Sequence, residues 1–208
     1  LAASLVMAPV MSVGATTTSG NSTSSAEEVI TSASSGEVTT VAEVPDTSTV
    51  AGVKSTTAGV YLATGVNGSV VTTSVAAIAE GYGLTGSEKP YAKFSNLDAK
   101  KSPLAKAAID LAAQAKGAVV GPMLNIELGK MTAGKYSLLS AEGAAIRISL
   151  GIPKNFAQTD STYAVVCVRA GGAVTILEDV DSNPDTVTFD TTGGAGAVSY
   201  THLRAHET

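Results

Sequence analysis

The chain has 208 residues, a net charge of −5 at pH 7, one Cys, two His and an aromatic fraction of 4%. This length allows one domain, or one domain with disordered extensions. The acidic balance argues against a nucleic-acid partner, because nucleic-acid binders carry a basic footprint. A single Cys excludes an internal disulfide framework.

Residues 1–15 are apolar and end in small residues. Val13 and Ala15 fit the −3 and −1 positions of a secretory cleavage site, so we interpret this stretch as the remnant of a signal peptide. A short buried helix is the alternative, whereas a membrane-spanning helix would need about 20 apolar residues. The interpretation predicts an extracellular or cell-surface location, with no membrane contact beyond the signal peptide.

Residues 16–57 resemble a linker. Nearly half of them are Ser or Thr, none is aromatic, and their apolar residues stand mostly singly. Such a stretch cannot bury enough surface to offset the entropy of ordering it. We therefore predict a disordered spacer, with one weak strand over residues 37–44 as the alternative, and a folded domain over residues 58–197.

The last eleven residues, VSYTHLRAHET (198–208), match the translation of the adapter end used in transposase-based sequencing libraries. We interpret them as an adapter-derived tail and exclude them from the prediction of the fold. His202 and His206 both lie in this tail, so residues 16–197 contain no His. That excludes His-dependent catalysis and the usual His/Cys zinc sites for this region.

The domain begins with two short strand candidates at residues 59–64 and 70–73. Asn67-Gly68 between them predicts a β-hairpin, because both residues tolerate a positive φ. Ser74 then caps a predicted helix over residues 75–81. Gly81, Gly83 and Gly86 match G-x-G-x-x-G, but the motif follows a helix where a dinucleotide site needs a strand, so we interpret these glycines as helix terminators and predict no cofactor.

The clearest predicted helix covers residues 102–116, with Ser102 at the N-cap and Pro103 at the first position. The spacing of its apolar residues places one set on a single face, which we expect to pack on a sheet; the set is Leu104, Ala107, Ala108, Leu111 and Ala115. Lys106 and Asp110 form an i,i+4 pair on the opposite side.

From residue 119 onward the pattern has period two. Strands are predicted at residues 123–128, 136–139, 144–150, 163–168, 173–177 and 186–190. Ile146, Ile148 and Leu150 should face the core, as should Val187 and Phe189, with the alternate residues outward. The predicted fold class is α+β: mainly an antiparallel β-sandwich, with a hairpin and one or two helices N-terminal to it.

Two candidate sites lie among these strands. Cys167 falls in an apolar strand, which favours a buried thiol over a catalytic one. Asp179, Asp181, Asn183 and Asp185 place side-chain oxygens at every second position, as in a calcium-binding loop, and Asp190 stands where the last ligand would be. Pro184 occupies the position that needs glycine, so we favour an acidic turn between two strands and keep calcium as a weak alternative.

The second half of the domain resembles a β-sandwich module found near the C-terminus of secreted and surface proteins of Gram-positive bacteria. The resemblance covers about residues 134–197 and rests on Ile152-Pro153 with Phe156, residues 163–168, residues 171–177 and residues 186–191. In that family a closing strand with an aromatic residue follows. Here the adapter-like tail follows instead, so the strand is either missing, which truncates the fold, or mimicked by tail residues such as Tyr200.

The resemblance implies an extracellular structural or interaction role and carries no site residues. We therefore predict a non-catalytic module, with cell-wall or host glycans or other surface proteins as partners. A carbohydrate-binding module is the first alternative and predicts exposed aromatic residues on one face, drawn from Tyr61, Tyr82, Tyr91, Phe94 and Tyr136. A carboxylate-dependent hydrolase is the second and predicts a pocket with convergent acids. If the closing strand is missing, the exposed sheet edge should cause self-association.

Overall fold

The structure is a computed structural model that describes residues 48–159 and 161–204. The predicted signal-peptide remnant (1–15), most of the predicted linker and residues 205–208 lie outside the described residues. The predicted start of the domain at residue 58 is wrong, because strands β1 (Thr49–Val50) and β2 (Val53–Lys54) already form a hairpin. Val50 is only 2% exposed. Just after the hairpin, the Thr56 N–H donates to the Val71 carbonyl over 2.9 Å, which joins this segment to the smaller sheet.

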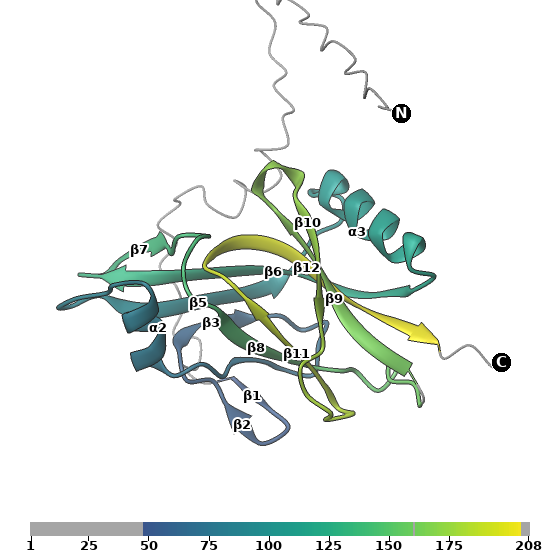
Figure 1. The fold of residues 1–208 in the computed structure, drawn as a ribbon, viewed down its shortest axis with the longest axis horizontal. Helices are drawn as coiled ribbons and strands as arrows, with labels where there is room; N and C mark the ends of the chain where they lie inside the picture. The colour runs from purple at the N-terminus through teal and green to yellow at the C-terminus, as the bar shows by residue number, and fades with distance from the viewer. Residues whose placement is uncertain (1–47, 160, 205–208) are drawn as a thin grey trace, which may run out of the picture.

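Besides the two-stranded β1–β2 sheet, two larger sheets make up the domain (Figure 1). The larger sheet has the order β10-β9-β12-β6-β5-β3, with β7 pairing to β6, and the smaller has the order β11-β8-β4. All neighbours are antiparallel except β3 and β5, which are parallel. The strands of the larger sheet are β3 (Ala58–Leu62), β5 (Lys89–Asn96), β6 (Val119–Thr132), β7 (Lys135–Leu138), β9 (Ser161–Arg169), β10 (Val174–Glu178) and β12 (Gly194–Arg204).

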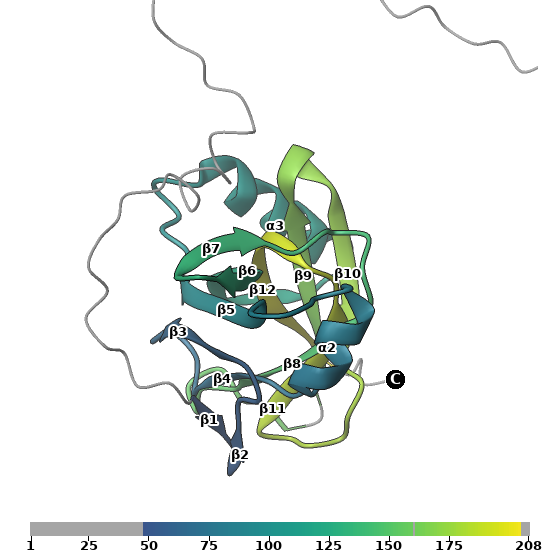
Figure 2. The ribbon, with the colours of Figure 1, turned by 90° about the vertical axis from the view of Figure 1, so that its left-hand side faces the viewer.

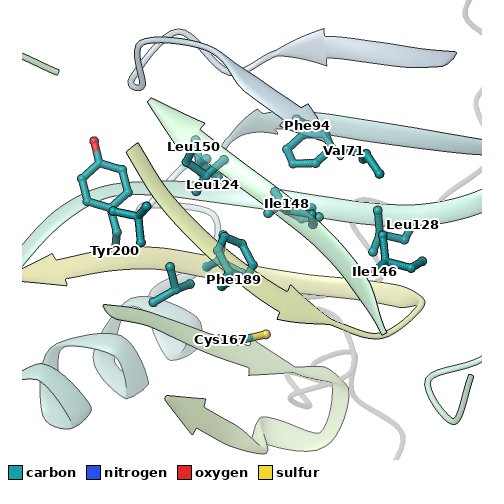
Figure 3. Packing of buried hydrophobic residues seen from close by; sticks show 14 of the residues in the cluster. Val71, Phe94, Leu124, Leu128, Ile146, Ile148, Leu150, Cys167, Phe189 and Tyr200 are labelled. Atoms are coloured by element: carbon teal, nitrogen blue, oxygen red, sulfur yellow. The ribbon is translucent and has the colours of Figure 1, made fainter. Parts of the chain in front are cut away.

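The smaller sheet consists of β4 (Ser69–Val71), β8 (Ile146–Gly151) and β11 (Thr186–Thr191). It packs against one face of the larger sheet, as Figure 2 shows, and the main hydrophobic core lies between the two (Figure 3). The helices are α2 (Val75–Gly81), α3 (Pro103–Ala115) and the short 3-10 turn η1 (Ala170–Gly172). The α+β, mainly antiparallel β-sandwich class is therefore confirmed.

Alternation along the strands of the smaller sheet supplies the core from one side. Ile148, Leu150 and Phe189 have no exposed surface, as the period-two pattern predicted. Thr188 was expected to face solvent but is only 3% exposed. The Thr188 hydroxyl lies 2.6 Å from the Ser149 hydroxyl of β8, and the loop after β10 runs along the edge of β11, where the Val180 N–H donates to the Thr188 carbonyl over 2.8 Å.

The predicted hairpin at Asn67-Gly68 does not form, because β3 and β4 belong to different sheets. The Asn67 N–H donates to the Gly151 carbonyl, and the Gly151 N–H donates to the Gly68 carbonyl, both over 3.0 Å. Gly68 has φ +93°, and a Cβ there would lie 2.4 Å from the Thr49 carbonyl oxygen. The turn therefore carries the chain from the larger sheet to the smaller one.

Both predicted helices form. The Ser74 hydroxyl accepts a hydrogen bond from the Ala77 N–H over 3.2 Å and so caps α2. In α3 the Lys106–Asp110 ion pair is present, with Pro103 at the first position. The Ser102 hydroxyl makes no capping hydrogen bond, although Ser102 stands at the N-cap.

The predicted buried face of α3 is wrong. Leu104 and Leu111 are 50% and 66% exposed, whereas Ala105, Ile109 and Ala113 are buried. These three residues pack on β9 and β12, where Val166, Val168 and Ala197 face the helix. Ala105 and Ala113, one helical repeat on either side of Ile109, allow the helix axis to approach the sheet closely, and leucines at those two positions would hold it farther away. Spacing alone did not distinguish the two faces, since each carries apolar residues.

The closing strand is present, so the fold is not truncated there. Strand β12 lies between β6 and β9 and hydrogen-bonds both of them. Val198 and Tyr200, two residues apart in this strand, both lie in the core and are 3% and 0% exposed. The prediction that residues from 198 onward lie outside the fold is therefore wrong for these two residues. No edge is exposed at β6 or β9 along this strand, so the reason for self-association is removed. The adapter origin of residues 198–208 stays a prediction about the gene.

The ring of Tyr200 packs edge-on against Phe156, with the ring centroids 5.1 Å apart. Gly121 makes room for it, because a Cβ at that position would lie 2.8 Å from the Tyr200 ring. The Tyr200 hydroxyl is buried and has no hydrogen-bond partner within residues 48–159 and 161–204. Burial also raises the pKa of Tyr200 above its ordinary value.

We predict that Tyr200→Ala lowers the free energy of unfolding by about 3–5 kcal/mol, the usual cost of truncating a buried aromatic ring. Tyr200→Phe is the matched control. It keeps the ring and removes an unsatisfied buried hydroxyl, so it should be neutral or stabilising. Urea unfolding of the full chain measures both. An unchanged midpoint for Tyr200→Ala would contradict the placement of β12 in the core.

Candidate functional site

The five aromatic residues proposed for a carbohydrate-binding face do not form one exposed cluster. Phe94 is fully buried and stacks on Tyr61 at 5.4 Å between ring centroids. The Tyr61 hydroxyl donates to the Thr57 carbonyl over 2.7 Å, and burial raises the pKa of Tyr61 to about 12. Tyr82 is half-buried, and its hydroxyl accepts from the Gly193 N–H. These three rings are structural.

The proposed calcium ligands cap the backbone of their own loop. Asp179 Oδ1 accepts from the Asp181 N–H over 3.3 Å, Asp181 Oδ1 from the Asn183 N–H over 2.8 Å, and Asn183 Oδ1 from the Asp185 N–H over 3.0 Å. Such side-chain-to-backbone bonds two residues on are Asx-turns. The spacing of oxygens at every second residue therefore builds the acidic connection between β10 and β11.

Asp190, the twelfth position of that loop pattern, is engaged elsewhere. Arg147 donates to both of its carboxylate oxygens over 2.8 Å, and this pair holds the pKa of Asp190 below its ordinary value. Across residues 48–159 and 161–204, no three His, Cys, Asp or Glu side chains are arranged to hold a metal ion. The structure thus does not bring the calcium candidates together around one point.

Cys167 is buried, as predicted, at 3% exposure. Burial raises the pKa of the Cys167 thiol, and Arg169 opposes that shift only in part. His202 is also buried, and its ring contacts Phe156 and Tyr163 with centroids 4.8 and 6.0 Å away. The thiol therefore lies where nucleophilic chemistry is disfavoured.

The glycine motif ends α2 as expected. Gly83 and Gly86 have φ of +60° and +62°, and the Thr85 N–H between them donates to the Glu88 carboxylate. The backbone N–H that would face a phosphate thus meets an acidic side chain, which disfavours an anion at this turn.

A groove lies on the face of the larger sheet that points away from the smaller sheet. Helix α3 packs on β9 and β12 of this face and also contacts β6, where Val120 and Met123 lie against the same cluster. Across the remainder, Lys93 pairs directly with Glu127, and Ser95 with Asn125, between β5 and β6. In β3, Val60 lies beside Lys93 and Leu62 beside Ser95. We call this space the β3–β5–β6 groove; it encloses about 300 Å³ and is closed by Asp98, Lys101 and Ser102 ahead of α3.

The electrostatic centre of the groove is Glu127. Its carboxylate lies 3.6 Å from Lys93 Nζ, and the residue is only 7% exposed. Burial raises the pKa of Glu127 above its ordinary value, and the positive charge of Lys93 opposes this. Lys93 Nζ also lies 3.8 Å above the ring of Tyr136, which in turn contacts Tyr91 edge-on.

Tyr136 is held against the sheet by Gly129. A Cβ at Gly129 would lie 2.4 Å from the Tyr136 ring, so only glycine allows the ring to lie there. Burial raises the pKa of Tyr136, and the nearby Glu127 carboxylate raises it further. One face of this ring is occupied by Lys93, so Tyr136 supports the charged pair and does not offer a free stacking surface.

Sequence reasoning missed the polar residues of this groove. Lys93, Ser95, Asn125 and Glu127 alternate with buried residues along β5 and β6, and that alternation was the available signal. It was not sufficient, because the partner of each strand and the position of α3 are set by long-range pairing.

No protein-family model, curated protein or solved structure matches the chain. Neither α-helix among the described residues has the length and hydropathy needed to cross a bilayer.

We predict that Asp179→Ala costs about 1–3 kcal/mol of unfolding free energy, because its carboxylate accepts from both Asp181 and the part-buried Thr188 N–H, and both donors would lose their acceptor. Asp185→Ala is the control, since its exposed side chain makes no such bond, and it should change stability by less than about 0.5 kcal/mol. Calcium at about 1 mM, the range of weak extracellular sites, should leave the unfolding midpoint unchanged. A rise in the midpoint with calcium would contradict the Asx-turn assignment.

We predict that Glu127 titrates above its ordinary value of 4.5. In that window the folded chain keeps a proton that the unfolded chain releases, so this group's contribution to stability falls as pH rises from 4.5 through the folded pKa. Lys93→Met should raise the pKa of Glu127 further, and Lys101→Met is the control. NMR titration of the Glu127 carboxyl carbon measures this, and a midpoint at or below 4.5 would contradict the burial of Glu127.

Proposed function

We propose that this chain is an exported, non-catalytic interaction module of the bacterial cell surface. The observation that carries the proposal is the β3–β5–β6 groove: beside α3, one face of the larger sheet presents polar side chains together with the exposed Leu62. A rigid sheet is a favourable scaffold for a binding surface, because its side chains are fixed by strand register.

The engagement of the candidate reactive groups supports a non-catalytic role. The oxygens of Asp179, Asp181 and Asn183 cap backbone N–H groups, and Asp190 is clamped by Arg147. The Cys167 thiol has a raised pKa. Groups committed to structural hydrogen bonds are poor proton donors and acceptors for a substrate.

The cell-surface location is supported by the sequence. The apolar stretch with Val13 and Ala15 fits a secretory cleavage site, and the Ser/Thr-rich stretch that follows suits a spacer. The arrangement of short antiparallel strands over residues 134–197 is compatible with the surface modules that this region resembles.

A carboxylate-dependent hydrolase is the second candidate. Glu127 and Asp98 line the same groove, and the raised pKa of Glu127 is a property of general acids. In this alternative Glu127 would donate a proton to a leaving group, and Glu127→Gln would abolish turnover without unfolding the chain.

Sedimentation with purified Gram-positive cell walls that retain their glycans and surface proteins tests the proposal. We expect the full chain to sediment with the walls and the supernatant to gain no reducing sugar or free amino groups. Bovine serum albumin provides the control for trapping. A chain that stays in the supernatant overturns the binding role, and product release that Glu127→Gln abolishes favours the hydrolase.

A further inference from the structure

We propose that the β3–β5–β6 groove binds a neutral saccharide chain. This inference rests on the proposed function and adds the chemical class of the ligand and the residues that contact it. Three features of the groove support it: polar side chains that make no hydrogen bond to described protein groups, a balanced charge, and an aliphatic surface beside them.

Three polar side chains of the groove lack a hydrogen-bond partner among the described protein groups. Ser95, Asn125 and Ser102 make no side-chain hydrogen bond within the part of the chain that the structure describes, although Ser102 is only 5% exposed. By contrast, the neighbouring Asn96 is fully engaged, since its Oδ1 accepts from Thr64 and Gly65. Hydroxyl and amide groups that are partly desolvated and still lack partners favour a ligand that supplies them.

The charge of the groove is balanced. Lys93 and Lys101 contribute two positive charges, and Asp98 and Glu127 contribute two negative charges. An anion would be attracted by the lysines and repelled by the carboxylates, and a cation would be attracted by the carboxylates and repelled by the lysines. A neutral ligand is the class that incurs neither repulsion.

The central ion pair is reached from the Lys93 side, since the Lys93 side chain is 38% exposed and that of Glu127 is 9% exposed. Lys93 Nζ and Glu127 Oε2 are 3.6 Å apart, beyond the usual range of a direct hydrogen bond. One hydroxyl of a sugar can donate to the carboxylate while its neighbour accepts from the ammonium. Asn125 and Ser95, the next pair along the strands, can continue this alternation of donors and acceptors.

The aliphatic surface comes from the edge strand β3. Leu62 is 53% exposed and Val60 is half-buried, and both lie on the same side of the sheet as Lys93 and Ser95. The C–H face of a pyranose ring can cover these side chains and remove them from water. This contact replaces the aromatic stacking that the sequence led us to expect, because Lys93 already occupies the ring of Tyr136.

NMR titration of the full, isotope-labelled chain with four neutral probes tests the inference: cellotetraose, xylotetraose, mannotetraose and chitotetraose. We expect at least one probe to shift the amides of residues 93–95 and 125–127, with its affinity reduced at least tenfold by Asn125→Ala. Asn183→Ala is the matched control, because it removes the same side chain in a loop away from the groove. Inorganic phosphate, titrated in the same way, is the anionic control probe.

The outcomes separate this inference from the proposed function. Shifts confined to the groove and lost in Asn125→Ala support it. No shift at millimolar concentrations of any probe, equal affinity of Asn125→Ala and wild type, or shifts with phosphate alone would each overturn it. If the chain still sediments with cell walls in those cases, the surface role stands and the saccharide assignment fails.

Discussion

The structure depends on β12, because this strand completes the backbone hydrogen bonds of two others at once. It pairs with β6 on one side and β9 on the other, and it also places Tyr200 in the core between the sheets. Without it, two long strands would present unpaired edges, and the aromatic cluster around Phe156 would lose Tyr200 and His202. The two halves of the larger sheet form one surface only while this strand joins them.

The joined sheet has two unlike faces. One is covered by the smaller sheet together with α2, and the core there is closed by branched and aromatic side chains. The other is covered by α3 above β9 and β12 and at the start of β6, where small residues let the helix approach. The segment ahead of the helix borders the β3–β5–β6 groove, since Asp98, Lys101 and Ser102 line it.

Polar groups in this protein divide into those that stabilise the fold and those that remain available. The oxygens of the acidic loop cap their own backbone, and Tyr82 joins Gly193 to Ala144 through two 2.7 Å hydrogen bonds. Ser95 and Asn125 make no such contacts within the described residues. The function is therefore proposed at the groove, and the acidic loop, which has the more recognisable sequence pattern, has a structural explanation.

Local pattern was enough to determine the strands and helices with strong periodicity. The alternation of Ile146, Ile148 and Leu150 and the capping Ser74 were predicted from sequence, because nearest neighbours determine them. Tertiary structure alone decided the separation of β3 from β4, the buried face of α3 and the groove. Each of these depends on which distant segments pair, and residues 60, 93 and 125 meet only after the sheet forms. The physical reason is that strand pairing is stabilised by contacts between segments far apart in the chain. The sequence of one strand therefore does not indicate which strand will pair with it.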